Sequence, residues 1–132
     1  MVNEIKMAYI FFNPNCKGKH VTDCVVRAIC RLENLSWLES FDQLTDICRQ
    51  ECDMPSSDKM WGLFLHSRGY TKHMIPEGTP FWYSVRDFCT DHPVGSYIVK
   101  TSGHVIAVVN GDYYDTFDSG DKYPIYYWRK EW

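Results

Sequence analysis

The 132-residue sequence lacks any apolar run of the roughly 18 residues that a membrane span requires. It also lacks a basic block, since 14 Lys and Arg face 17 Asp and Glu for a formal net charge of −3. A nucleic-acid groove needs clustered positive charge, so we expect neither a membrane nor a nucleic-acid partner. The first residues show no basic segment or small-residue cleavage site typical of a secretory signal. We therefore expect a cytoplasmic protein, in the cell that makes it or in a host cell.

The six cysteines raise two possibilities, disulfide bonds and a metal site. Thiols stay reduced in the cytosol, so we expect free thiols and no disulfides. Cys48 and Cys52 are four residues apart on an expected helix, which places both on one face. A zinc site would recruit further ligands such as Cys16, His66 or His73, but the spacing matches no common zinc module. We expect no metal and no cofactor, and a zinc-stabilised regulator is the weaker alternative.

The first part of the chain has helical periodicity. Helices are predicted from Thr22 or Asp23 to about Asn34, from Ser36 or Ser40 toward Met54 and Pro55, from Ser56 or Ser57 to Gly69, and from Ser84 to His92. Ser36 and Ser40 each stand three residues before a Glu or Gln, which is typical of a capping box at a helix start.

The last part of the chain is rich in β-forming residues. After a short strand at Tyr70 to Ile75, strands are predicted at Gly95 to Thr101, His104 to Val109, Asp112 to Phe117 and Tyr123 to Arg129. The Asn110-Gly111 pair between two of these runs indicates a hairpin. Helices followed by antiparallel strands predict one α+β domain over residues 1–132, with N-terminal helices packed on one side of a C-terminal antiparallel sheet.

Two distant residues suggest thiol chemistry. Cys24 follows Thr22 and Asp23, two good capping residues, at the start of the first long helix. The free N–H groups and the dipole of a helix N-terminus favour a thiolate. His104 follows Gly103 at the start of an apolar strand, so the pair has the character of a nucleophile and its base. The alternative is that Cys24 is a small buried apolar residue and His104 is structural.

Asp115 and Asp118 both qualify as the acid that orients the His104 ring. A two-residue loop at Asn110-Gly111 places Asp115 on the same face of the hairpin as His104, because side chains alternate along a strand. A three-residue loop with Gly111 in a bulge places Asp118 there instead. The residues alone leave both registers open.

Three segments resemble the papain-like cysteine peptidase superfamily: Cys24 at a helix start, the strand Gly103 to Val109, and Tyr114 to Ser119 on the next strand. The Asp23-Cys24 pair is similar to the bacteriocin-processing peptidases, and Asp23 to Ile29 is similar to the ovarian-tumour (OTU) deubiquitinases. The whole is most similar to small papain-like proteins of phages and bacterial mobile elements. The resemblance spans about residue 20 to the C-terminus and implies a papain-like fold.

The resemblance also implies a function. Cys24 would attack a peptide or isopeptide bond of a peptide or protein substrate and form a thioester, with His104 transferring the proton. Asp118 is the expected third residue, because Asp118-Ser119 falls where papain-like enzymes carry their orienting residue, and Asp115 is the second choice. The same triad would serve an acyltransferase that passes the acyl group to an amine.

The oxyanion donor departs from the family pattern. Papain-like enzymes carry a glutamine five or six residues before the nucleophile, where this sequence has a Gly-Lys pair. The Cys24 N–H can supply one donor, and Asn13, Asn15 or His20 a second if the loop folds back. Loss of one donor costs about 100- to 1000-fold in rate. The missing glutamine motivates a second hypothesis, a non-catalytic phage or plasmid module that inhibits a host factor.

Overall fold

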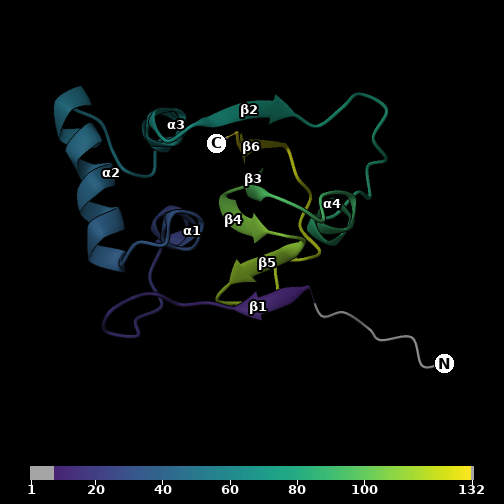
Figure 1. Ribbon diagram of the computed structural model, residues 1–132, viewed down its shortest axis with the longest axis horizontal. Coiled ribbons are helices and arrows are strands. Elements are labelled where there is room, and N and C mark those ends of the chain that lie inside the picture. The colour runs from purple at the N-terminus through teal and green to yellow at the C-terminus, as the bar shows by residue number, and fades with distance from the viewer. Residues whose placement is uncertain (1–7, 132) are drawn as a thin grey trace.

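The computed structural model describes residues 8–131 and has four helices and six strands in that range (Figure 1). In chain order these are β1 (Tyr9–Phe11), α1 (Cys24–Glu33), α2 (Trp37–Glu51), α3 (Asp58–Ser67), β2 (Tyr70–Met74), α4 (Val85–Asp91), β3 (Ser96–Thr101), β4 (His104–Val109), β5 (Asp112–Asp115) and β6 (Tyr126–Lys130). The predicted α+β class is confirmed. Within residues 8–131, no helix combines the length and apolar character needed to cross a bilayer.

All six strands form one sheet in the order β1-β5-β4-β3-β6-β2. Every neighbouring pair is antiparallel except β1 and β5, which run parallel. The sequence did not predict β1, because a strand of three residues is too short to show a period of two. The hairpin of β4 and β5 lies inside the sheet, so its register is fixed by neighbours on both sides.

The helices cover both faces of the sheet (Figure 1). Helices α1, α2 and α3 pack with Val105 and Ala107 of β4, whereas α4 packs with Ile106 and Val108 of the same strand. The expectation that the helices lie on one side is therefore wrong for α4. Alternating residues of β4 are apolar on both faces, and such a strand requires a helix on each side.

Candidate active site

Cys24 is the first residue of α1, and its side chain is half-buried at the N-terminal end of that helix. The N-cap residue, Asp23, makes no side-chain hydrogen bond to the N–H groups of the first turn. These N–H groups are therefore not covered by a capping side chain. A helix end in this state presents partial positive charge to a nearby sulfur or oxygen anion.

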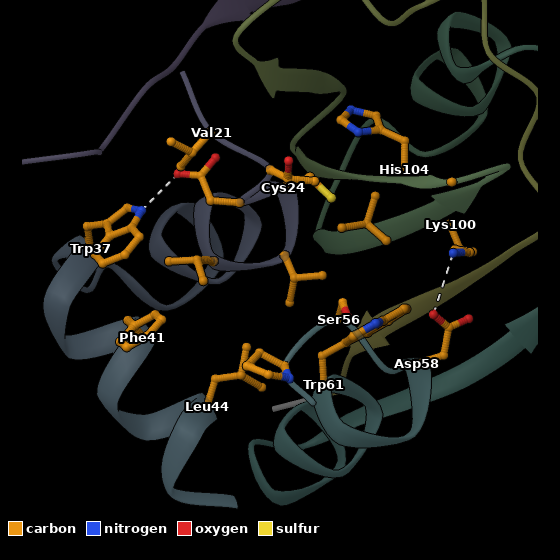
Figure 2. A pocket seen from close by; sticks show the side chains of 17 residues that line it. Val21, Cys24, Trp37, Phe41, Leu44, Ser56, Asp58, Trp61, Lys100 and His104 are labelled. Carbon is orange, nitrogen blue, oxygen red and sulfur yellow. Dashed lines mark hydrogen bonds and ion pairs between the residues drawn. The ribbon is translucent and has the colours of Figure 1, made fainter. Parts of the chain in front are cut away.

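His104 is the first residue of β4 and lies beside Cys24 (Figure 2). Its Nε2 atom is 2.6 Å from Oδ2 of Asp115, and the ring is close enough to the Cys24 thiol to lower the pKa of that thiol. Because Nε2 is occupied by the carboxylate, Nδ1 is the nitrogen left for the sulfur. The helical and sheet parts of the chain thus bring together the two residues that the sequence singled out.

Asp115, the last residue of β5, is buried, with 2% of its surface exposed. Each of its oxygens has two donors. Oδ2 accepts from His104 and from the Ser119 hydroxyl at 2.7 Å, and Oδ1 accepts from the Thr116 N–H at 2.8 Å and from the Arg27 guanidinium at 3.1 Å. A buried carboxylate with four donors is held ionised and in one orientation.

The hairpin register explains why Asp115 occupies this position. Val109 pairs with Asp112, so Asn110 and Gly111 form a two-residue loop. Both loop residues have positive φ, 49° and 80°, as a type I′ turn requires. This is the register that places Asp115 on the same face as His104.

The structure corrects the expectation that Asp118 orients the ring. The Asp118 carboxylate accepts hydrogen bonds from the Tyr113 hydroxyl, from the Gly120 N–H at 3.1 Å and from Arg86 at 3.0 Å. Its side chain is 46% exposed. The chain turns after β5, so this carboxylate pairs with Arg86, which follows the first residue of α4, and Asp115 takes the place beside His104.

The surroundings of the thiol favour its ionised form. Burial raises the pKa of the Cys24 thiol. The interactions with the His104 ring and the Val105 N–H, together with the positive charges of His104 and Arg27, lower this pKa by more than burial raises it. The net effect is a pKa below the ordinary cysteine value. Cys30 and Cys48 differ, because for these thiols burial outweighs the hydrogen bonds and leaves each pKa above the ordinary cysteine value.

The imidazole shows the complementary change. Burial lowers the pKa of His104, but hydrogen bonds to Asp115 and Cys24 raise it to about 9. Burial has the opposite effect on the Asp115 carboxyl and raises its pKa, but the hydrogen bonds from His104 and Ser119 bring that pKa below its usual value. These shifts favour a thiolate, an imidazolium and a carboxylate over the neutral forms, a charge pattern suited to nucleophilic attack followed by proton donation.

A cavity of about 530 Å³ opens beside Cys24 and His104 (Figure 2). On one side of Cys24 its wall is apolar: the Trp37 and Phe41 rings stack with centroids 5.1 Å apart, and Leu44 lies next to them. On the other side lie Lys100 and Asp58, joined by an ion pair of 3.5 Å. The cavity is large enough for a side chain of a substrate and touches the sulfur.

The residues proposed as a second oxyanion donor do not reach this cavity. Neither Asn15 nor His20 lines it, and His20 is exposed. Oδ1 of Asn15 accepts from the N–H groups of Lys17 and Lys19, and the Asn13 amide donates to the Lys19 carbonyl. The loop before α1 thus forms hydrogen bonds within itself. Cys24, at the uncapped helix end, does line the cavity.

Arg27 and Ser119 were not predicted as site residues, although both side chains, like His104, hydrogen-bond to the Asp115 carboxylate. One signal was available for Arg27: it is a charge inside the apolar run of α1, four residues after Asp23, the spacing of an ion pair on a helix. The zinc alternative gains no ligand set, since Cys48 is buried while Cys52 is exposed, and residues 8–131 hold no group of three or more ligand side chains placed for a metal.

Comparison with known proteins found no matching family model, no matching curated protein and no matching solved structure. The function of the protein is therefore inferred from the geometry of Cys24, His104 and Asp115.

Proposed function

We propose that this protein is a cysteine hydrolase of papain-like fold that cleaves a peptide or isopeptide bond of a peptide or protein substrate. One observation carries the proposal: a thiol at an uncapped helix start lies beside a histidine on the wall of one cavity (Figure 2), and Nε2 of that histidine is 2.6 Å from a buried carboxylate. A thiol, an imidazole and an acid in this order are the parts of a nucleophilic triad. A nucleophile on the first helix and its base on a strand of the sheet also support the papain-like fold.

The proposed reaction follows from the charges of the site. The Cys24 thiolate attacks the carbonyl carbon, and the carbonyl oxygen, now negative, accepts a hydrogen bond from the Cys24 N–H. His104 gives its proton to the leaving amine as the C–N bond breaks, which leaves a thioester. Neutral His104 then removes a proton from water, and the hydroxide attacks the thioester carbon. The C–S bond breaks, the carboxylic acid leaves, and the Cys24 thiolate and the His104 imidazolium are restored. Asp115 stabilises the imidazolium throughout.

A peptide-cleavage experiment tests this proposal. Incubation of the protein with peptides from a cellular proteome is expected to produce new N-termini, detected by mass spectrometry, and the Cys24→Ala variant is expected to produce none because it lacks the nucleophile. An added primary amine tests for acyl transfer, since a transferase would join it to the acyl fragment. If the wild-type protein and Cys24→Ala give the same peptides, the hydrolase proposal is wrong and a non-catalytic role is favoured.

The apolar wall of the cavity predicts a preference for substrates with a large apolar residue beside the scissile bond. Phe41 is 38% exposed on α2 and lines the cavity, so Phe41→Glu places a negative charge where the apolar side chain of the substrate would bind. We expect kcat/KM for an apolar-residue substrate to fall about 10-fold or more, as for the loss of one well-buried apolar contact.

Leu38→Glu is the matched control for this prediction. Leu38 is on the same helix and 56% exposed, but it does not line the cavity. The control variant should keep kcat/KM within about twofold, because exposed substitutions away from a site change little. Equal losses in both variants would show that the cavity wall does not select the substrate.

A further inference from the structure

Arg27 lies inside the protein, three residues after the nucleophile, with 7% of its surface exposed. Its Nη2 atom donates to Oδ1 of Asp115 at 3.1 Å, and its Nη1 atom donates to Asp23 and, at 3.5 Å, to the Val21 carbonyl. One guanidinium therefore joins the acid of the triad to the N-cap residue of the helix that carries the thiol.

Asp23 is also buried and hydrogen-bonded through both carboxylate oxygens. It is 7% exposed, and its Oδ2 atom accepts from the Trp37 indole N–H at 2.9 Å. This carboxylate, at the N-cap position, points away from the helix end and toward Arg27. Two buried carboxylates thus share one buried cation. Buried charges are tolerated when paired in this way, and a planar guanidinium can bridge two carboxylates at fixed angles.

We propose that Arg27 is a positioning residue of the triad, which fixes the Asp115 carboxylate so that Oδ2 faces His104 and keeps Asp115 ionised. The inference rests on the proposed function, because it assigns Arg27 a part in the same reaction. Arg27 touches no reacting atom. It acts through Asp115 on the imidazolium, and its positive charge also lowers the pKa of the Cys24 thiol.

Charged groups from several helices and strands surround the thiol and the imidazole. They are Asp23 and Arg27 at the start of α1, His104 of β4, Asp115 of β5, and the ion pair of Lys100 (β3) with Asp58 (α3) across the cavity. Helix α2 contributes uncharged aromatic rings to the cavity. Arg27 is the cation bonded directly to the carboxylate that holds His104, so its replacement should change the pH range in which Cys24 is a thiolate.

The test compares Arg27→Lys with Arg31→Lys. Lysine keeps the charge but has no fork to bridge Asp23 and Asp115. Arg31 is one turn further along α1. It contacts Tyr114, which precedes Asp115 in β5, and donates a 3.2 Å hydrogen bond to the Tyr114 hydroxyl. Each protein is checked for folding by circular dichroism. The rate of Cys24 alkylation by iodoacetamide is then measured at mildly acidic and at strongly alkaline pH, where every thiol is ionised.

For Arg27→Lys we expect alkylation at acidic pH to fall about three- to tenfold, the effect of a rise of up to about one unit in the pKa of the thiol. The alkaline rate should stay near that of the wild type, and Arg31→Lys should match the wild type at both pH values. An equal loss at both pH values would reveal a merely structural role and overturn the proposal. So would a profile of Arg27→Lys identical to that of Arg31→Lys.

A double variant, Asp23→Asn with Arg27→Gln, removes both charges of the pair and decides the question if Arg27→Lys does not fold. It should show the same loss at acidic pH, and a wild-type profile would overturn the proposal. The proposed function fails in a different way, namely if wild-type Cys24 itself reacts no faster than the other cysteines at acidic pH.

Discussion

Asp115→Asn is expected to lower kcat/KM for peptide cleavage by about 100-fold or more, the range found when a general acid–base system is disabled. The asparagine amide cannot stabilise the imidazolium as a carboxylate does, and its NH₂ group would face a donor on His104, Ser119, Thr116 or Arg27 whichever way it is turned. The measurement is the initial rate on a peptide identified by the cleavage experiment.

Asp118→Asn is the matched control, three residues along the chain. Asp118 bonds to Arg86, Tyr113 and Gly120 near the surface, so its loss should leave the rate within about threefold. If Asp118→Asn were the inactive variant and Asp115→Asn the active one, the assignment of the acid would be reversed.

His104→Ala has the second large expected effect, on the thiol itself. The ring supplies the side-chain hydrogen bond and the nearest positive charge that lower the pKa of Cys24, while burial raises it. Without the ring, the pKa of the thiol should rise, and alkylation of Cys24 at mildly acidic pH should fall about 10-fold or more. The measurement is the pH dependence of alkylation.

His66→Ala is the control for His104→Ala, because His66 is exposed on α3 and does not line the cavity beside Cys24. Its alkylation profile should match that of the wild type. A Cys24 that reacts at the same rate with and without His104 would show that the two residues do not act as a pair.

Local chemistry in the sequence was enough to single out Cys24 and His104 as a pair. A cysteine behind two capping residues and a histidine opening an apolar strand are visible in the sequence, and both residues line the same cavity in the structure. The third residue was predicted wrongly as Asp118, with Asp115 as second choice, because a shift of one residue in the hairpin exchanges the two. A two-residue loop favoured Asp115, as observed, whereas the family resemblance favoured Asp118.

Other parts of the structure depend on contacts that a single sequence does not reveal. The parallel pairing of β1 with β5 joins ends of the chain that share no local pattern. The position of α4 on the opposite face of the sheet follows from a central strand that is apolar on both sides. The bond of Arg27 to Asp115 spans 88 positions of the chain, and helical spacing predicts only its other bond, to Asp23.

The most direct test of the account is limited alkylation of the folded wild-type protein by iodoacetamide at mildly acidic pH, with each of the six cysteines quantified by mass spectrometry. Cys24 is half-buried, whereas Cys16 and Cys52 are exposed, so access alone would favour the latter two. If Cys24 is a thiolate paired with His104, it should react about 10-fold or more faster than either. Reaction of Cys16 or Cys52 at least as fast as that of Cys24 would contradict the account.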